Sequence, residues 1–231
     1  ILAPATPMPE LPDLVYIEKV LRGSLAGATI TGVSVREPVV LRVAVPEGFA
    51  SALSGRTLKA LRRHGPFLVL EFPPLELVVH FMLAGHFRLS AADNGPGRAG
   101  RDLCFSLTFS DGRKLEYLDE RRMGKVYLVR HGDYEGIPGF LAQGIDVLSE
   151  DFSEQAFRRL ISGCRKQVRV FLMDQSALSA IGNAYADEIL FEARLHPKTG
   201  CHQLSDEEIG RLFNSIRSVL AWGIFTDGGT Q

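Results

Sequence analysis

The sequence has few cysteines, no long hydrophobic run and no large excess of charge of one sign. Its 231 residues include only three cysteines, Cys104, Cys164 and Cys201, which are widely spaced and form no CxxC pair. This pattern favours a reducing compartment over a disulfide scaffold, and it leaves no zinc cluster within the chain. No apolar run reaches the roughly 18–20 residues that a transmembrane helix needs, so we expect no membrane partner.

The charge is nearly balanced, with 26 Lys and Arg against 27 Asp and Glu. Total charge therefore makes no case for nucleic acid as a partner. The basic residues do gather in three local clusters, which either neutralise phosphates along one cleft or form ordinary solvated faces. These clusters are Arg56, Lys59, Arg62 and Arg63; Arg121, Arg122 and Lys125; and Arg165, Lys166 and Arg169. A composition of 45% hydrophobic and 23% charged residues excludes a disordered or collagen-like chain.

Hydrophobic periodicity divides the chain into a β-rich part and a helical part. Residues 13–25 place their apolar side chains on one face of a helix, with Pro12 at its entry. From about 29 to 128, short β-rich runs alternate with turn signals, which predicts an antiparallel sandwich or barrel. The predicted strands are 30–35, 39–45, 67–72, 77–80, 104–109, 115–118 and 126–129.

From residue 153 onward the periodicity is helical, with predicted helices over 153–162, 164–174, 183–193 and 205–222. Strands followed by helices indicate an α+β protein of two lobes, with a boundary near 135–150. We therefore assign residues 1–145 to an antiparallel β-sandwich lobe with a flanking N-terminal helix, and residues 146–231 to a helical lobe.

Four short stretches are more specific than this general pattern. Residues 8–13 read Met-Pro-Glu-Leu-Pro-Asp, residues 80–85 His-Phe-Met-Leu-Ala-Gly, residues 119–124 Asp-Glu-Arg-Arg-Met-Gly, and residues 181–188 Ile-Gly-Asn-Ala-Tyr-Ala-Asp-Glu. In order and separation they resemble the motifs of the formamidopyrimidine-DNA glycosylase / endonuclease VIII family. The resemblance extends from about Met8 to Thr230.

This resemblance implies a helix–two-turn–helix motif in the helical lobe and a base-excision-repair DNA glycosylase acting on damaged double-stranded DNA. The implied substrates are oxidised bases of the 8-oxoguanine and formamidopyrimidine type, and an abasic-site lyase step can follow. In the family, removal of the initiator Met frees the secondary amine of proline, here Pro9, which attacks the sugar C1′. An α-amino group has a reference pKa of about 8, so much of it is neutral at physiological pH. Glu10 would transfer protons at the sugar.

The resemblance also implies which side chains contact DNA. Asn183 would cap a helix whose free N–H groups hold a backbone phosphate, assisted by Arg169; a plain helix cap is the alternative. The side chains that fill the gap left by the flipped base would be Leu83, Arg121 and Met123. Core packing stays open as the alternative for these positions, and Arg122 beside them would contact phosphate or base.

Three departures from the family pattern affect these expectations. While Met8 precedes Pro9, the Pro9 nitrogen is a tertiary amide; because the chain begins with Ile1, we expect it to be processed or trimmed, with translation from Met8 freeing Pro9. The lysine that the family carries near the sugar is replaced by Pro66, so its contact would be lost or move to Arg63 or His64. The chain stops where the linker to the family's zinc finger would begin, so we expect no cofactor in this chain, with zinc only in a finger outside it.

Three classes of function stay open on the sequence alone. The first is the glycosylase. The second is a catalytically impaired protein that binds lesions or abasic sites, which the amide at Pro9 and the proline at position 66 favour. The third is a two-lobed structural protein, supported only by the near-neutral charge. We expect a monomer, located in the cytoplasm and associated with the nucleoid.

Overall fold

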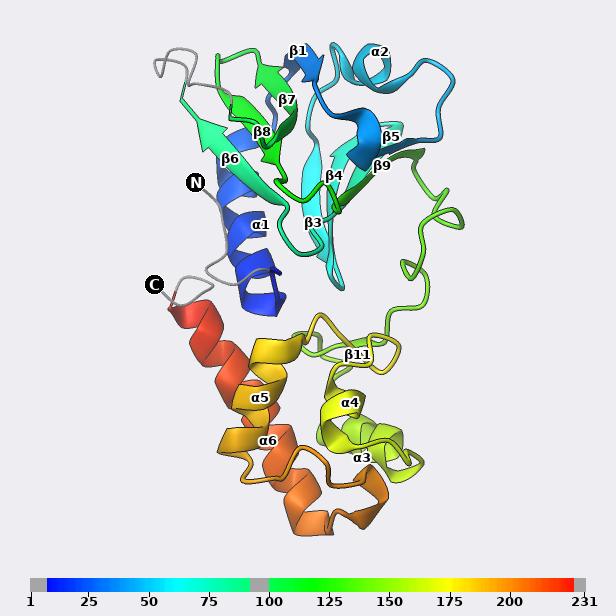
Figure 1. Cartoon of the computed structure of the whole chain (residues 1–231), viewed down its shortest axis with the longest axis vertical. Helices are drawn as coiled ribbons and strands as arrows, with labels where there is room; N and C mark the ends of the chain where they lie inside the picture. The colour runs from blue at the N-terminus through cyan, green and yellow to red at the C-terminus, as the bar shows by residue number, and fades with distance from the viewer. Residues whose placement is uncertain (1–7, 92–99, 227–231) are drawn as a thin grey trace.

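The computed structural model describes residues 8–91 and 100–226, which form two lobes stacked along the long axis of the molecule, sheets above and helices below (Figure 1). Within these two ranges, no helix is long and apolar enough to cross a membrane. The α+β, two-lobed prediction is confirmed.

The upper lobe is a sandwich of two sheets. The four-stranded sheet has the order β1-β7-β8-β6 and contains β1 (Ile30–Val35), β7 (Leu103–Phe109), β8 (Lys114–Leu118) and β6 (His86–Ser90). The five-stranded sheet has the order β2-β9-β5-β4-β3 and contains β2 (Leu41–Val43), β9 (Lys125–Arg130), β5 (Leu75–His80), β4 (Phe67–Phe72) and β3 (Ala60–His64). Neighbours are antiparallel except β2, which runs parallel to β9. The sandwich prediction is therefore confirmed, and the barrel alternative is wrong.

In this lobe one predicted strand is partly wrong, and three short elements were not predicted. The strand expected over 39–45 begins as a 3-10 turn, η1 (Pro38–Val40), because proline fixes φ and lacks an N–H for strand pairing. The short helix α2 (Phe49–Leu53) and the strands β3 and β6 carry too weak a hydrophobic period to be predicted. Each of β3 and β6 is held by one neighbouring strand, at an edge of its sheet.

The N-terminal helix α1 (Leu11–Leu25) lies beside the sandwich and contacts β3 and the last helix (Figure 1). It buries Leu14, Ile17 and Leu21 against the sandwich core, as the period predicts. The helix begins two residues earlier than predicted, because the buried Asp13 carboxylate accepts a hydrogen bond from the Glu10 N–H at 3.0 Å. Proline in the first turn is compatible with this start.

The outer face of the five-stranded sheet is covered by the linker between the lobes, residues 131–144. Ile137 and Phe140 of the linker pack with Phe67 and Val69 in a second hydrophobic cluster. Because this sheet is buried on both faces, β4 reads as a continuous apolar run instead of an alternating one. The predicted boundary after residue 145 stays a prediction.

A buried carboxylate, that of Glu76, fixes the start of this linker to the sheet. Its side chain is 1% exposed and accepts hydrogen bonds from the Tyr134 hydroxyl at 2.6 Å and from Arg62 at 3.4 Å, while His131 Nδ1 lies 2.8 Å away. A buried charge needs such partners. The linker therefore belongs structurally to the upper lobe.

The lower lobe contains α3 (Glu154–Ser162), α4 (Val168–Leu172), α5 (Asn183–Glu192), the 3-10 turn η2 (Cys201–Gln203) and α6 (Asp206–Phe225), with a short parallel pair of β10 (Ile145–Asp146) and β11 (Leu178–Ser179). Ser153 and Ser205 cap α3 and α6. The helix predicted over 164–174 is wrong in its first turn. The backbone there pairs instead with 199–201, Cys201 N–H to Lys166 at 2.9 Å and Val168 N–H to Thr199 at 2.8 Å.

The Glu76 cluster generates a test of the linker's attachment. Tyr134→Phe removes one hydrogen bond to a buried carboxylate and keeps the ring, so we expect the free energy of unfolding to fall by about 1.5–3 kcal/mol. Chemical denaturation measures this change. Tyr127→Phe is the matched control, because no hydrogen bond of its hydroxyl is present among the described residues. Equal losses in both variants would contradict the role given to the Tyr134 hydroxyl.

Candidate active site

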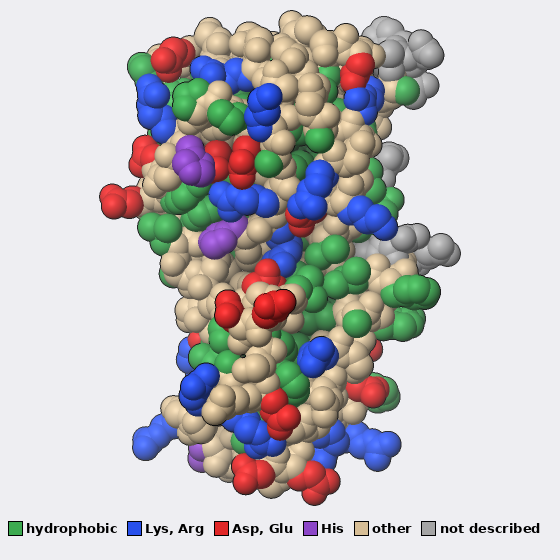
Figure 2. All heavy atoms as spheres, turned by 180° about the vertical axis from the view of Figure 1, so that it is seen from behind, with side chains coloured by type: hydrophobic (Ala, Val, Ile, Leu, Met, Phe, Trp, Pro, Cys, Tyr) green, Lys and Arg blue, Asp and Glu red, His purple; other side chains and the backbone are tan. Residues whose placement is uncertain are grey.

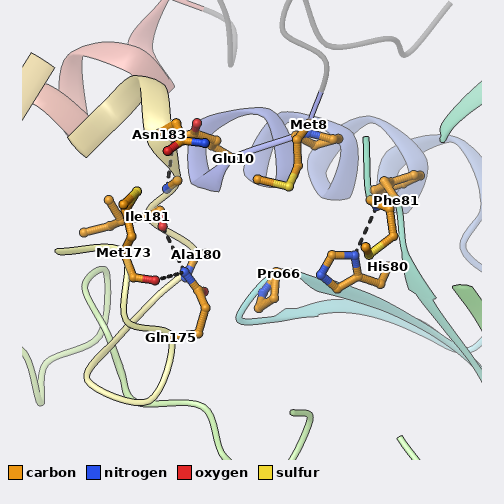
Figure 3. Close-up of a pocket in the computed structure, with 13 residues that line it drawn as sticks. Met8, Glu10, Pro66, His80, Phe81, Met173, Gln175, Ala180, Ile181 and Asn183 are labelled. Carbon is orange, nitrogen blue, oxygen red and sulfur yellow. Dashed lines mark hydrogen bonds between the residues drawn. The ribbon is translucent and has the colours of Figure 1, made fainter. Parts of the chain in front are cut away.

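A pocket of about 250 Å³ lies where the two lobes meet, and three parts of the chain line it (Figure 3). The N-terminal segment supplies Met8, Pro9 and Glu10. The upper lobe supplies Pro66, from the turn between β3 and β4, and His80, Phe81 and Met82 at the end of β5. The lower lobe supplies Met173, Gln175 and the run from Ala180 to Asn183.

The carboxylate of Glu10 binds the N-terminus of α5. Its Oε2 accepts from Gly182 N–H at 3.0 Å and from Tyr185 N–H at 3.1 Å, and its Oε1 accepts from Ala184 N–H at 2.9 Å. A helix N-terminus presents unpaired N–H groups and a positive dipole end, so a carboxylate there is stabilised. Leu11 N–H adds a backbone bond to Ala180 at 3.0 Å. The N-terminal segment is thereby attached to the lower lobe.

Burial raises the pKa of Glu10, against the lowering effect of its three N–H partners. Burial likewise raises the pKa of the neighbouring Asp13 to about 6, although the Glu10 N–H favours its ionised form. Of the two, Glu10 lines the pocket, and a carboxyl group with a raised pKa in a pocket is typical of a site that transfers protons.

Gly182 is needed because of this carboxylate. A Cβ at position 182 would lie 2.5 Å from Glu10 Cδ, a distance that no side chain tolerates. The loop before it is held by Gln175, whose side chain accepts from Ala180 N–H at 2.7 Å and donates to Ile181 O at 2.9 Å. Gln175 was not among the predicted site residues, because it falls just after the helix predicted over 164–174 and a lone amide carries no signal.

Asn183 is the first residue of α5 and not its cap, which is Gly182. The prediction that Asn183 caps free N–H groups is therefore wrong in detail, because Glu10 already occupies those groups. The Asn183 residue is exposed, and its Oδ1 accepts from Arg169 at 3.3 Å. Arg169 in turn forms a two-pronged ion pair with Asp187, at 2.6 and 3.2 Å. Asn183 and Arg169 therefore form one polar surface beside the pocket.

The loop 119–124 is organised by the fully buried carboxylate of Asp119. It accepts hydrogen bonds from the N–H groups of Arg121 at 3.0 Å, Arg122 at 2.9 Å and Gly124 at 2.7 Å. Three charge-assisted bonds fix the backbone of the loop and do not involve the side chains of Arg121 and Met123, which are exposed.

The hydroxyl of Tyr117 lies between this loop and the loop 81–85. A Cβ at Gly85 or at Gly124 would collide with it. The hydroxyl is buried and has no hydrogen-bond partner among the described residues. Met82 and Arg122 both adopt a left-handed backbone with a φ of 54°, which is unfavourable for these residue types and is kept only where surrounding contacts impose it.

The structure separates the predicted gap-filling side chains from the core. Leu83 is partly exposed and Met123 is 42% exposed, and neither belongs to a core cluster, so the core-packing alternative is wrong for both. Arg121 is exposed on the same loop as Met123 but does not line the pocket. Arg122 is paired with Glu37 at 2.9 Å.

Neither residue proposed to replace the missing lysine faces the pocket. The Arg63 side chain is only 7% exposed and is paired with Asp146. His64 Nε2 lies 2.7 Å from Phe140 O of the linker. This placement argues against the phosphate contact predicted for Arg63, because a buried guanidinium that already has a carboxylate partner cannot reach DNA.

His80, which sequence reasoning named only as part of a motif, does line the pocket (Figure 3). Its Nδ1 accepts from Met82 N–H at 3.1 Å, so the other ring nitrogen carries the proton. Burial, aided by the charge of Lys125, lowers the pKa of His80 to about 4. At neutral pH it is thus an uncharged donor beside Pro66.

Half of the residues in the basic clusters are paired with acids. Figure 2 shows Lys and Arg side chains across the upper lobe with acidic side chains directly among and beneath them. Of the cluster members, five form ion pairs: Arg62, Arg63, Arg122, Lys166 and Arg169. A DNA backbone would therefore compete with carboxylates for several of these cations.

The cysteines are not arranged as a zinc site. Among the residues that the structure describes, no group of three or more His, Cys, Asp or Glu side chains is placed to hold a metal ion. Cys104 lies in the upper lobe and Cys164 and Cys201 in the lower one. The expectation that this chain takes no cofactor stays a prediction.

Two family models match the chain: the formamidopyrimidine-DNA glycosylase N-terminal domain over residues 8–126, and the H2TH domain of the same enzyme over residues 143–231. A formamidopyrimidine-DNA glycosylase of Bacillus subtilis is 33% identical over 224 residues, 96% of this chain and 80% of that protein. One of Thermus thermophilus is 36% identical and covers 96% of this chain and 78% of its own length.

Solved structures agree with these matches. The crystal structure of the MutM (Fpg) protein from Thermus thermophilus superposes with a TM-score of 0.83 at 33% identity, covering 96% of this chain and 79% of that one. The complex of Lactococcus lactis Fpg with DNA containing FAPY-dG superposes with a TM-score of 0.85 at 28% identity, covering 96% and 82%.

The Tyr117 contact can be tested with a double mutant. Gly124→Ala forces a methyl group against the Tyr117 hydroxyl, and we expect a loss of about 1–3 kcal/mol in unfolding free energy. Tyr117→Phe alone should cost little, since the hydroxyl is unpaired, and combined with Gly124→Ala it should restore most of the loss. Gly85→Ala is the control: its methyl also meets Phe81 O at 2.6 Å, so Tyr117→Phe should not rescue it. Rescue of both, or of neither, would refute the contact.

The raised pKa of Asp13 predicts a pH dependence. Its folded value of about 6 exceeds the usual 3.8, so the stability that Asp13 contributes is complete below about pH 4 and is lost as the pH rises through 6. The melting temperature of the wild type minus that of Asp13→Asn should therefore fall between pH 4 and 7. Asp111→Asn, at an exposed site where Arg113 lowers the pKa, should show no such fall. A flat difference curve for Asp13→Asn would show that its pKa is not raised.

Proposed function

The chain belongs to the formamidopyrimidine-DNA glycosylase family, and from this premise we propose how its residues carry out the reaction. It is a DNA glycosylase of base-excision repair, and damaged double-stranded DNA is its partner. The proposal concerns the nucleophile, the DNA contacts and the class of lesion. The observation that carries it is the meeting of Pro9, Glu10 and Asn183 in one pocket between the lobes.

Pro9 is the nucleophile once its nitrogen is a free secondary amine. The amine forms a bond to C1′ of the damaged nucleotide as the glycosidic bond breaks, and the base leaves with a proton. Opening of the sugar then gives an iminium intermediate, from which β-elimination of the 3′ phosphate cuts the strand. Pro9 is buried and lines the pocket together with Gly182 and Asn183, and burial disfavours a protonated amine and so favours the reactive form.

Glu10 holds the N-terminal segment in place and transfers protons at the sugar. Its three N–H bonds fix the carboxylate, and Oε1, which accepts only one of them, keeps a lone pair for a proton. Its raised pKa brings proton affinity closer to neutral pH, as a general acid or base requires.

Asn183 and Arg169 contact the DNA backbone next to the lesion. Both lie on the lower-lobe side of the pocket, and their side chains are already joined by a hydrogen bond. A phosphate would bind the amide of Asn183 and share Arg169 with Asp187. His80, on the other side of the pocket, offers an N–H where the family has lysine.

Leu83, Arg121 and Met123 enter the space vacated by the flipped nucleotide. They project from two loops that both pack against the Tyr117 hydroxyl. This packing fixes their positions, and side chains that replace a flipped base in the stack must be held in a fixed position. Arg122, paired with Glu37, stands at the margin of this wedge and contacts phosphate.

The proposed substrates are oxidised purines of the 8-oxoguanine and formamidopyrimidine type, processed by a monomer that takes no cofactor in this chain. Acting on DNA, the protein would work in the cytoplasm, associated with the nucleoid. Similarity to the Lactococcus lactis protein bound to FAPY-dG supports the lesion class.

Borohydride trapping tests the nucleophile. Protein that begins at Pro9 is incubated with duplex DNA carrying one formamidopyrimidine or 8-oxoguanine, and we expect a covalent adduct and base release. Protein that begins at Met8 is the matched control and should give no adduct, because its Pro9 nitrogen is an amide. Glu10→Gln should lower base release at least tenfold.

Lesion-selective binding by the Pro9 form, with neither adduct nor base release, would instead support the alternative of a catalytically impaired lesion-binding protein. Equal adduct from the two forms would assign the attack to another amine and overturn the proposal for Pro9.

A further inference from the structure

Two of the three cysteines lie side by side in the lower lobe, although they are far apart in the sequence. Cys164 follows the end of α3, and Cys201 opens η2. Both are free thiols, α3 packs against η2, and Cys164 is close enough to influence the Cys201 thiol. The two cysteine side chains are therefore neighbours.

The backbone around the pair is fixed by hydrogen bonds. Cys201 N–H bonds to Lys166 O at 2.9 Å, Val168 N–H bonds to Thr199 O at 2.8 Å, and Gln167 forms a β-bridge with Gly200. These bonds hold the strand-like segments 166–168 and 199–201 against each other, directly beside the two cysteines. Joining the sulfurs needs side-chain movement and little movement of the backbone, which is the condition for an unstrained disulfide.

The two thiols differ in access and in charge environment. Cys164 is partly exposed, whereas Cys201 is 2% exposed. Burial is the main cause that raises the pKa of Cys201 to about 12. The neighbouring Cys164 raises this pKa further, and the charge of Lys166 lowers it. Lys166, which is paired with Asp174, interacts with both sulfurs. A small oxidant therefore reacts with Cys164 first, and the Cys201 thiol reacts afterwards with the modified Cys164.

Cys104 provides a contrast within the same chain. It is fully buried in β7, and its thiol donates hydrogen bonds to the backbone oxygens of Asp102 at 3.6 Å and Asp119 at 4.0 Å. Burial raises its pKa to about 11. No cysteine lies next to it among the described residues, so it has no partner for a disulfide within the fold.

We propose that Cys164 and Cys201 are a redox-active dithiol that forms a reversible intramolecular disulfide when the protein meets a low-molecular-weight disulfide. The Cys164 thiolate attacks one sulfur of the small disulfide, whose S–S bond breaks and releases one thiolate. Cys201 gives its proton to solvent and attacks the Cys164 sulfur, and the second small thiolate leaves. Two protein thiols lose two electrons, and one small disulfide becomes two thiols.

The consequence lies in the segment that leads into α4. The disulfide would join residue 164 to residue 201. The chain between them, which contains α4, would then form a covalently closed loop. Arg169 lies in α4, its own N–H bonds to Pro197 O at 3.4 Å, and its side chain reaches Asn183 and Asp187. The oxidised form would hold the proposed phosphate contacts more rigidly than the reduced form.

The test uses the full chain, equilibrated with a series of reduced and oxidised glutathione mixtures, then alkylated and mapped by peptide mass. We expect one linked peptide pair, containing Cys164 and Cys201, with the loss of two hydrogen atoms and full reversal by dithiothreitol. Cys104→Ser should behave like the wild type. Cys164→Ser, at the partly exposed position, should abolish the link and keep the circular dichroism of the fold. The link should raise the melting temperature by roughly 5 °C or more.

Three results would overturn the proposal. One is a folded wild type that keeps both thiols alkylatable across the whole glutathione series. Another is a set of links in which Cys104 pairs as often as Cys164 and Cys201, as an unfolded chain would give. A mixed disulfide with glutathione that stays on Cys164 would equally refute it, because Cys201 would then not act as the second thiol. None of these readouts depends on glycosylase activity.

Discussion

The three hydrogen bonds from the N-terminus of α5 to the Glu10 carboxylate are the interaction on which the site depends. They connect the N-terminal segment to the lower lobe, and they close one wall of the pocket. They also explain why position 182 is glycine, since any Cβ would meet the carboxylate. One charged group thereby determines the position of Pro9, the start of α5 and the orientation of Asn183.

This arrangement changes which groups of the motif at 181–188 are available to bind a phosphate. From sequence alone, glycine followed by asparagine indicates a helix start open to a phosphate. In the folded protein the helix start is already filled by an internal anion, and only the side chain of Asn183 is left for an external one. The information needed for this correction lies in residue 10, far away in the sequence, so no local reading of 181–188 can supply it.

Much of the fold could be predicted because its periodicities are strong: the strands of the sandwich core and three of the four long helical segments in the lower lobe follow from apolar spacing. What could not be predicted depends on partners distant in sequence. The start of α4 is set by backbone pairing with 199–201, and the edge strands β3 and β6 each depend on a single neighbour. Of the site, the motifs identify Pro9, Glu10 and Asn183. They give no hint that Gln175 and Tyr117 brace its loops, or that Asp146 takes Arg63 away from DNA.

The packing of the linker on the sheet has a mechanical consequence. Phe140 is buried with the upper lobe, and Gly144 N–H is bonded to Gln175 O of the lower lobe at 2.7 Å. Only residues 141–143 connect these two anchored points, and four extended steps of chain span at most roughly 14 Å. The short joint therefore keeps the lobes from drifting apart, and the contact of α1 with α6 is a second connection between them. A DNA duplex that binds between the lobes would therefore contact two surfaces whose relative position is already restricted. Binding would lose less orientational entropy than it would if a long, flexible linker joined the lobes.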